Sequence, residues 1–413
     1  MPASTARSLA TNTAATHSAA TSPFDFLAAQ GHERLVIFHD PATDLRGAIA
    51  IHSTVRGPAL GGTRLRAYAR MEEGVLDALR LAEAMTYKAA VAGLPLGGGK
   101  AVLFADGREQ DPAVREARLL AYGRVIEQLG GMYITAEDAN TTMADMAVIR
   151  RATRHVAGLA PADGGGGDPS PVTAVGVLAG MQALAADVLG VSSLSGVRVA
   201  IQGLGKVGLA LAELLVAAGA AVTACDVRPE VARAAAEALG IAVVAPEAIF
   251  DVPCAIFAPC AYGGVLDDET IPRLTCQIVA GSANNQLREP RHAEALRARG
   301  IAYAVDYVIN AGGLINVAQE LAPGGYDAAA ARERTLGIAA TVRRIQARAE
   351  ADGISTERAA HALALDAIQP AAKSAGRKRA SAGASSPGTS RAAANGASQG
   401  EPQGVPAGRR SAR

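Results

Sequence analysis

Residues 197–208 read VRVAIQGLGKVG, an apolar run followed by closely spaced glycines. The run predicts a buried strand, and Gly203, Gly205 and Gly208 form the pattern GxGxxG ahead of an Ala/Leu-rich helical segment. In such a turn the first glycine permits a tight bend, the second lets the backbone approach a pyrophosphate, and the third lets helix and strand pack closely. The stretch predicts a dinucleotide site with the phosphates at the helix N-terminus, although the motif alone also suits a plain glycine-rich turn.

Asp226 supports the dinucleotide interpretation, because it ends the next predicted strand 18 residues after Gly208, where an acid binds the ribose hydroxyls. An acid at this place repels a 2′-phosphate, so NAD is favoured over NADP. Arg228, two residues further on, keeps NADP as an alternative cofactor, because an arginine can accommodate a 2′-phosphate. The cofactor-binding residues predicted from this turn and this acid are Gly203, Leu204, Gly205, Lys206, Val207, Gly208, Leu209 and Asp226.

Strand-like and helix-like segments alternate along this part of the chain. The strand-like ones include VRVAIQ (197–202), AVTACD (221–226), CAIFAPCA (254–261), CQIVAGSA (276–283) and IAYAVDYVI (301–309). Alternation of this kind implies an α/β fold, in which a parallel sheet is covered by helices. Ahead of it, PADGGGGDPSP (161–171) is too rich in glycine and proline for a helix or a central strand, and it predicts a hinge between two domains.

Residues 85–104, MTYKAAVAGLPLGGGKAVLF, hold Lys88 and Lys100, two of only five lysines in a chain with 35 arginines. The apolar spacing upstream predicts a helix that ends before the glycines and the proline, and AVLF (101–104) predicts a short buried strand. We therefore expect Lys100 in a glycine loop. Leu94 and Ala101 stand where a phosphate loop needs Gly and Ser or Thr, so that motif is excluded.

Both lysines have an ordinary interpretation and a functional one. Lys88 suits a cation in the last turn of a helix, and Lys100 suits a loop lysine in water. Arginine would serve both purposes, whereas only lysine loses a proton near neutral pH when it is desolvated. The choice of lysine favours a chemical role, with Lys100 suited to act as a base.

Seven segments, in order and in both halves, closely resemble the leucine, valine and phenylalanine dehydrogenases of the glutamate dehydrogenase superfamily. They are GPALGGTRL (57–65), MTYKAAVAGLPLGGGKAV (85–102), YITAED (133–138), GLGKVG (203–208), IFAPCAYGG (256–264), GSANNQL (281–287) and DYVINAGGLINVAQE (306–320). The resemblance runs from about residue 25 to 368. It implies a substrate and oligomerisation domain (23–155), a Rossmann NAD-binding domain (156–330), and C-terminal helices (331–370) that return to the first domain.

The resemblance also implies roles for single residues. Lys88 matches the lysine that holds the substrate α-carboxylate, Lys100 the catalytic lysine, and Asp138 the carboxylate that assists proton transfer. Thr173 matches a threonine near the nicotinamide, and Asn285 an asparagine at the cofactor and substrate cleft. These roles suit oxidation at Cα, which needs a fixed carboxylate, a hydride acceptor and a base that activates water.

The implied substrate pocket consists of Leu60, Gly61, Ala136, Leu314 and Val317, all uncharged. Glutamate dehydrogenases carry a lysine at the position of Leu60, so a glutamate side chain would be buried here without a partner, at a cost of several kcal/mol. Ala136 resembles the residue that leucine-type enzymes carry at this position, whereas Leu314 resembles the residue found in some phenylalanine-type enzymes. The pocket predicts an apolar amino acid, with activity that overlaps between Leu, Val, Ile and Phe.

One turn departs from the family pattern. Relatives read DVGT after the acid, and this chain reads Asp138, Ala139, Asn140 and Thr141. Asparagine is the residue that best replaces glycine at positive φ, so we expect the turn to survive.

The resulting hypothesis is a cytoplasmic, homo-oligomeric, NAD-dependent L-amino acid dehydrogenase that forms a 2-oxo acid and ammonium and runs in reverse as a reductive aminase. A phenylalanine-type dehydrogenase is the alternative within the class. A non-catalytic NAD-sensing regulator is the alternative outside it, but both lysines and Asp138 would then have no purpose. No metal site, membrane or nucleic acid is implied for the body of the chain.

Composition agrees with a two-domain globular protein of 413 residues. No apolar run is expected to reach the roughly 20 residues of a membrane helix. Four cysteines without metal-ligand spacing predict buried, reduced thiols. Residues 1–22 and 371–413 predict disordered tails, the second basic, with eight Lys or Arg and one acid.

Overall fold

The computed structural model describes residues 22–369. The tails predicted at 1–22 and 371–413 lie outside these residues, except for Ser22, whose hydroxyl oxygen accepts a hydrogen bond from the Phe24 amide at 3.3 Å. Ser22 thereby caps α1 (Pro23–Gln30), the first helix.

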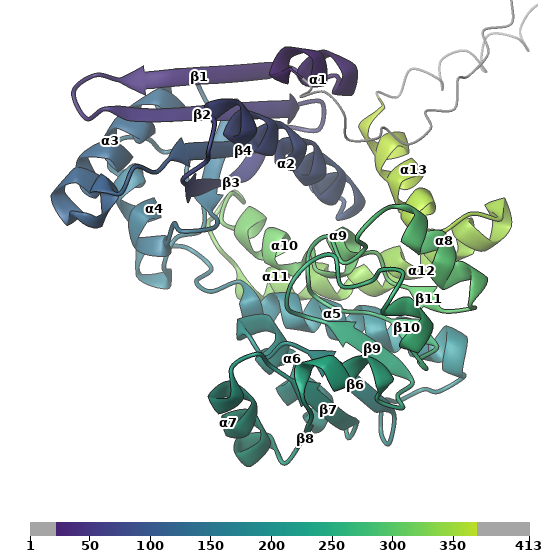
Figure 1. The fold of residues 1–413 in the computed structure, drawn as a ribbon. Coiled ribbons are helices and arrows are strands. Elements are labelled where there is room, and N and C mark those ends of the chain that lie inside the picture. The colour runs from purple at the N-terminus through teal and green to yellow at the C-terminus, as the bar shows by residue number, and fades with distance from the viewer. Residues whose placement is uncertain (1–21, 370–413) are drawn as a thin grey trace, which may run out of the picture. The chain divides into compact units, whose positions relative to one another are not determined.

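The first sheet has five strands in the order β1-β2-β4-β3-β5 (Figure 1). β2 is antiparallel to β1 and β4, whereas β3 is parallel to both β4 and β5. The strands are β1 (Arg34–Asp40), β2 (Leu45–Ser53), β3 (Ala59–Arg66), β4 (Gly97–Phe104) and β5 (Tyr133–Glu137). The helices of this half are α2 (Met71–Val91), α3 (Pro112–Gln128) and α4 (Met143–Arg150), with a 3₁₀ turn η1 (Arg108–Gln110). Residues of α3 and α4 share a core with one face of the sheet, and α2 covers the other face.

β4 corrects the predicted glycine loop, because the strand begins at Gly97 and Lys100 lies inside it. The three glycines serve close packing and not a bend. A Cβ on Gly98 would lie 2.1 Å from the Thr86 amide nitrogen of α2, and a Cβ on Gly99 would lie 2.7 Å from the Tyr133 ring. Side chains are therefore excluded where α2 and β5 approach the strand.

The second sheet is parallel throughout, as the alternating pattern predicts, with the order β11-β10-β9-β6-β7-β8. Its strands are β6 (Arg198–Gln202), β7 (Ala221–Cys225), β8 (Ala242–Val243), β9 (Ile256–Pro259), β10 (Ile278–Val279) and β11 (Ala302–Tyr303). The sequence pattern misses β8, which is an exposed edge strand of two residues.

The helices of this half are α5 (Ser170–Leu184), α6 (Lys206–Ala217), α7 (Pro229–Leu239), α8 (Arg291–Ala298), α9 (Asp306–Ile309) and α10 (Gly312–Gln319). Shorter helical turns are η2 (Pro161–Asp163), η3 (Ala185–Leu189), η4 (Pro246–Asp251) and η5 (Ile271–Arg273). All four cysteines are free thiols, and three of them are buried as expected; Cys260 is half-buried.

Residues Ser170–Leu189 form one continuous helical stretch that would suit a membrane span by length and composition alone. This corrects the expectation that no apolar run reaches such a length. More than half of its most apolar part, 56%, is buried inside the protein, as in the core helix of a globular protein. Gly176 and Gly180 have no room for a side chain beside Ile338 and Ile309, which places α5 in the core.

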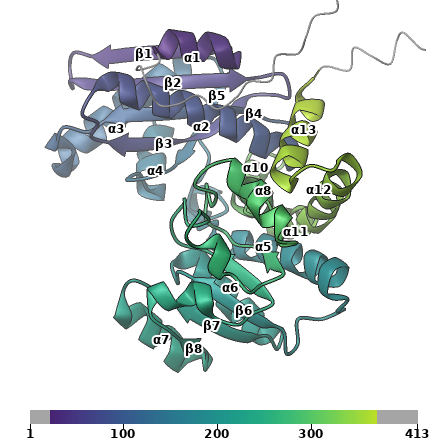
Figure 2. The same ribbon diagram turned by 45° about the vertical axis from the view of Figure 1, so that its right-hand side comes forward.

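The chain ends in three helices, α11 (Ala328–Leu336), α12 (Ile338–Asp352) and α13 (Thr356–Ile368). α13 lies beside the end of α2, as Figures 1 and 2 show. The Tyr87 and His361 rings meet edge to face, with centroids 4.8 Å apart. Arg56 Nη1 donates to the Ala367 carbonyl at 3.0 Å. The last helix is thus attached to the first sheet's half of the molecule.

The segment between the two sheets is held by Glu320, which follows α10. Its carboxylate accepts backbone hydrogen bonds from Gly158 at 2.8 Å, Leu159 at 3.2 Å and Gly166 at 2.9 Å. Gly164 and Gly167 adopt positive φ, which explains the glycine-rich composition of this segment. Burial raises the pKa of Glu320, although the three N–H donors oppose that shift.

Candidate active site

Lys100 and Asp138 form a buried ion pair, with Nζ 3.1 Å from Oδ2. Lys100 is only 5% exposed, so the alternative of a loop lysine in water is wrong. Burial lowers the pKa of Lys100, and the neighbouring Asp138 offsets part of that effect. For Asp138, burial raises the pKa, but the positive charges of Lys100 and Arg64 outweigh it and hold the pKa below its usual value.

Lys88 lies in the last turn of α2 and contacts the other half of the molecule. Its Nζ donates to Asn310 Oδ1 at 2.7 Å, and Asn310 Nδ2 donates to the Ser282 carbonyl at 3.1 Å and to Asn284 Oδ1 at 2.8 Å. A hydrogen-bonded chain therefore connects this lysine to the loop after β10.

Two charged neighbours shift the pKa of Lys88 in opposite directions. Burial lowers the pKa of Lys88 to about 8, Asp306 opposes that shift, and Lys100 adds to it. The two lysines thus lie close enough to repel each other.

The turn after β5 positions Asp138 above a glycine. A Cβ on Gly62 would lie 2.7 Å from the Asp138 Cβ, so the carboxylate occupies space that any other residue would fill. Asn140 adopts φ 63° and donates from Nδ2 to the Leu65 carbonyl at 3.0 Å. The Asp138 amide donates to Thr141 Oγ1 at 2.9 Å. The expected survival of the turn is confirmed.

Leu60, Ala136, Leu314 and Val317 are all buried and belong to one continuous apolar cluster. Leu60 and Ala136 come from β3 and β5, and the other two come from α10. Gly61 lies beside them, and its carbonyl accepts a hydrogen bond from the Tyr133 hydroxyl at 2.8 Å. None of the five predicted pocket residues is charged, and the cluster that holds four of them contains core residues of both halves.

The GxGxxG turn follows β6 with each glycine in a distinct environment. Gly203 adopts φ 96°, and a Cβ on Gly208 would lie 2.1 Å from the Gly203 carbonyl oxygen. A Cβ on Gly205 would meet no atom within 4 Å, so open space lies in front of the second glycine. Helix α6 starts next to it without a side-chain cap, which leaves first-turn N–H groups for an anion.

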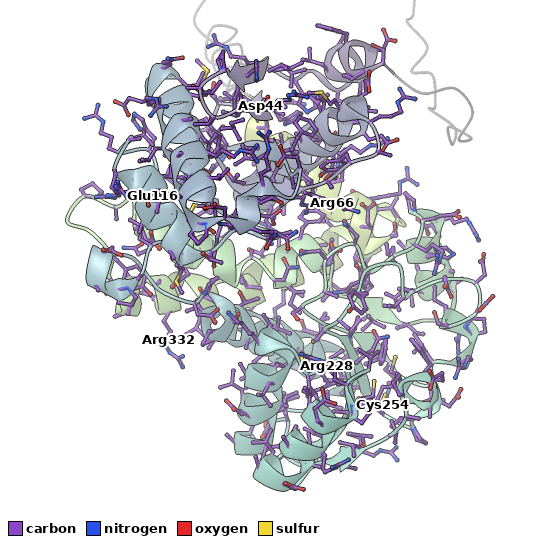
Figure 3. The ribbon with its side chains drawn as sticks, turned by 60° about the vertical axis from the view of Figure 1, so that its left-hand side comes forward. Asp44, Arg66, Glu116, Arg228, Cys254 and Arg332 are labelled. Carbon is purple, nitrogen blue, oxygen red and sulfur yellow. The ribbon has the colours of Figure 1, made fainter. Side chains whose placement is uncertain are left out.

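Asp226 follows β7, and both of its carboxylate oxygens are engaged. Oδ2 accepts from the Leu204 amide at 2.9 Å, and Oδ1 accepts from the Arg228 amide at 2.9 Å and from its Nε at 3.2 Å. Arg228, labelled in Figure 3, is therefore paired with the acid that the sequence placed at the ribose.

The remaining predicted residues lie around the start of α5 and in the loop after β10. Thr173 Oγ1 donates to the Pro169 carbonyl at 2.9 Å, and a Cβ on Gly313 would lie 2.8 Å from this hydroxyl. Asn285 adopts φ 52° with an exposed side chain, and it is Asn284 that bonds Asn310. Lys206 is exposed and forms an ion pair with Asp168, Nζ to Oδ2 3.1 Å.

Sequence reasoning missed several partners of the predicted residues, namely Arg64, Asn310 and Asp168. Each lies in a segment already singled out, GPALGGTRL, DYVINAGG and PADGGGGDPSP. The available signal was a polar residue within five positions of a predicted site residue. Within residues 22–369, no group of three His, Cys, Asp or Glu side chains is arranged to hold a metal ion.

A buried lysine–carboxylate pair and a glycine turn after a parallel strand are features expected of a nucleotide-dependent oxidoreductase. Residues 32–155 match the family model described as Glu/Leu/Phe/Val dehydrogenase, dimerisation domain. Residues 226–376 match the model described as Glutamate/Leucine/Phenylalanine/Valine dehydrogenase. The chain belongs to this family and is an amino acid dehydrogenase.

Similar proteins cover most of the chain. The leucine dehydrogenase of Thermoactinomyces intermedius is 48% identical over 346 residues, which is 84% of this chain and 93% of that protein. The valine dehydrogenase of Streptomyces albus is 47% identical over 337 residues, 81% of this chain and 91% of its own length. The crystal structure of L-tryptophan dehydrogenase from Nostoc punctiforme has a TM-score of 0.74 at 40% identity, and the match covers 84% of this chain and 98% of that one.

Proposed function

We propose that this amino acid dehydrogenase uses NAD to oxidise an apolar, branched-chain L-amino acid to its 2-oxo acid with release of ammonium, and that it catalyses the reverse reductive amination. The observation that carries the proposal is the buried Lys100–Asp138 pair, 3.1 Å apart, next to strands that carry the uncharged Leu60 and Ala136. The match to leucine dehydrogenases over most of the chain supports it.

Lys88 would anchor the substrate α-carboxylate. Its ammonium already points at a polar partner, Asn310, and its last-turn place on α2 fixes the direction of the side chain. A substrate carboxylate would add negative charge beside this half-buried ammonium, so binding would favour the protonated lysine.

Lys100 and Asp138 would move protons at the reacting carbon. When bound, the nicotinamide cofactor accepts the hydride from Cα. Lys100 in its neutral form would take a proton from the water that attacks the resulting imine, since burial favours loss of its charge. Asp138 would bind the amino group and exchange protons with Lys100 across the 3.1 Å contact.

The residues of the glycine turn fit NAD. Open space in front of Gly205 leaves room for a pyrophosphate next to the uncapped start of α6, where Leu204, Lys206, Val207 and Leu209 line the turn. Asp226 supports NAD over NADP, because a 2′-phosphate would meet its carboxylate and because Arg228 is already paired with that acid. Thr173 and Asn285 would lie toward the nicotinamide end.

The pocket supports an apolar side chain, since Leu60, Gly61, Ala136, Leu314 and Val317 carry no charge. A phenylalanine-type activity is the second candidate, and similarity to an L-tryptophan dehydrogenase favours giving aromatic substrates a place in the test. The proposal includes a homo-oligomer, which the description of the matched first half as a dimerisation domain supports, and a cytoplasmic location.

The test measures NADH formation from L-Leu, L-Val, L-Ile, L-Phe and L-Trp with the wild type, Lys100→Ala and Lys100→Arg. We expect the highest kcat/KM on a branched-chain substrate and a loss of about 10³-fold in both variants, since arginine keeps the charge but cannot act as a base. No turnover on any substrate, or full activity of either variant, would contradict the proposal.

A further inference from the structure

Arg64 connects the buried ion pair to helix α2. It lies on β3, the strand between β4 and β5, and its side chain is only 20% exposed. Its Nε donates to Asp138 Oδ2 at 2.9 Å, and its Nη1 donates to Asp77 Oδ2 at 2.8 Å. One planar guanidinium thus spans from the turn after β5 to a carboxylate on α2.

Sheet register places Arg64 on the same face as Lys100. Arg64 pairs with Val102 of β4, and Lys100 lies two residues before Val102 on that strand, so the two side chains share a face. Gly62, two residues before Arg64, contributes no side chain to this face and leaves its space to Asp138. The carboxylate is therefore reached by cations from two neighbouring strands.

Both cations contact the same oxygen of Asp138. Lys100 Nζ lies 3.1 Å from Oδ2, and Arg64 Nε donates to that same atom. No hydrogen bond from any residue between 22 and 369 reaches Oδ1. Among residues 22–369, the carboxylate is thus held by one oxygen, Oδ2, and not by the other.

The far end of Arg64 is also fixed. Asp77 Oδ2 accepts from Arg64 and from the Tyr68 hydroxyl at 2.6 Å. Because Asp77 lies on α2, the helix that also carries Lys88, rotation of the guanidinium would break contacts at both of its ends.

The charge of Arg64 matters when Lys100 is neutral. The charged groups that face Lys100 are Asp138 after β5, Arg64 on β3, and Asp77 and Lys88 on α2. If Lys100 were the sole partner of Asp138, loss of the lysine proton would leave a buried carboxylate unpaired, and the carboxylate would tend to take that proton. An arginine remains charged at any working pH and prevents this.

We propose that Arg64 is a positioning residue of the deamination: it holds Asp138 by Oδ2, directs Oδ1 toward the substrate amino group, and keeps the carboxylate ionised while Lys100 is neutral. The inference rests on the proposed roles of Lys100 and Asp138. Within residues 22–369, the Arg64 side chain forms its hydrogen bonds with Asp138 and Asp77, and with neither the predicted pocket residues nor the glycine turn.

The test compares the pH dependence of kcat/KM for wild type, Arg64→Gln, Arg64→Lys and Asp77→Asn. Arg64 lowers the pKa of Lys100, whereas Asp77 raises it. Since the base must be neutral, activity rises with pH through this pKa. Arg64→Gln should move the acid limb of the pH profile of kcat/KM to higher pH by about one unit, and it should lower kcat on the order of tenfold or more. Asp77→Asn, which keeps an oxygen acceptor for Arg64 and Tyr68, should move the limb to lower pH.

Arg64→Lys separates charge from geometry. It should return the acid limb toward the wild-type position while kcat stays low, because a lysine cannot bridge Asp138 and Asp77 at once. Limb shifts in the same direction for Arg64→Gln and Asp77→Asn, or an unchanged limb and kcat in Arg64→Gln, would overturn the inference.

Folding of each variant is checked by thermal unfolding, and if Arg64→Gln does not fold, Arg64→Lys and Asp77→Asn decide by the same limb shifts. Failure here differs from failure of the proposed function. An inactive Lys100→Ala with an unaffected Arg64→Gln rejects only the role of Arg64, whereas an active Lys100→Ala rejects the proposed base.

Discussion

Two glycine-rich stretches that each lead into a lysine, GGGK (97–100) and GLGK (203–206), use their glycines in opposite ways. In the first, Gly98 and Gly99 lie against backbone and ring atoms of the protein itself, and Lys100 is buried in a strand. In the second, Gly205 faces open space, and Lys206 is 76% exposed. Similar composition thus gives a close-packed strand in one half of the molecule and an open turn in the other.

The difference lies in what occupies the space that a side chain would fill. Protein atoms fill it at Gly98, so the glycine brings α2 close enough to enclose a lysine and lower its pKa. Nothing in the described chain fills it at Gly205, so the glycine keeps room for a ligand. Four substitutions test this comparison.

Gly98→Ala should have the largest effect. Its Cβ would lie 2.1 Å from the Thr86 amide nitrogen and 2.5 Å from the Ala82 carbonyl oxygen, both backbone atoms of α2. We expect the free energy of unfolding to fall by about 3 kcal/mol, measured by urea denaturation. A variant as stable as the wild type would show that α2 and β4 tolerate separation.

Lys88→Met tests the cost of enclosing a cation. The folded protein holds the pKa of Lys88 at about 8, below the 10.5 of an unfolded chain. The unfolded chain therefore binds more protons than the folded one between these pH values. The enclosed Lys88 ammonium destabilises the folded protein fully below about pH 8, and this destabilisation disappears by about pH 10.5.

The free energy of unfolding of the wild type, relative to Lys88→Met, should accordingly rise by about 3 kcal/mol between pH 7 and 10.5. Parallel denaturation series at fixed ionic strength measure the difference. If the difference in the free energy of unfolding does not change with pH, Lys88 is not desolvated in the folded protein.

Gly205→Ala should affect ligand binding and not stability. The added Cβ meets no protein atom within 4 Å and the residue does not need positive φ. We expect an unchanged unfolding midpoint and an increase of about tenfold in the KM for NAD, since the methyl group obstructs the pyrophosphate. Loss of stability with an unchanged KM would reverse the assignment of the two glycine stretches.

Lys206→Gln should have the smallest effect. An exposed ion pair such as Lys206–Asp168 contributes less than about 1 kcal/mol, so stability should not change measurably. We expect NAD to bind about threefold more weakly at low salt, and Asp168→Asn, which frees the lysine, to have the opposite effect. Binding titrations at two salt concentrations measure both, and shifts of the same sign would exclude the charge explanation.

The second half of the fold was predictable because its signals are local. Each parallel strand except β8 is predicted from the short apolar run in which it lies, and the glycine turn and Asp226 are adjacent to those runs in sequence. β4 was not predictable in this way, because its three glycines have low strand propensity. The need for glycine there comes from close contacts with α2 and β5, which are distant in sequence.

The same distinction applies to the site. The lysines could be singled out from composition, and their roles came from family resemblance. Their partners could not, because Arg64 and Asp138 are 74 residues apart and Lys88 and Asn310 are 222 apart. A hydrogen bond over such a separation leaves no periodic pattern in the sequence, and only the folded chain reveals it.

The carboxylate of Glu320 has a consequence for how the two sheets can move. The backbone amides of residues 158, 159 and 166 all donate to it. Breaking any of these hydrogen bonds would leave a partly buried N–H group without its acceptor. Residues 158–166 must therefore travel with the end of α10 as one rigid piece. Gly167, with φ 68°, also belongs to this piece, because its amide donates to the Leu159 carbonyl at 3.2 Å, so any joint in this connection lies between Gly167 and α5.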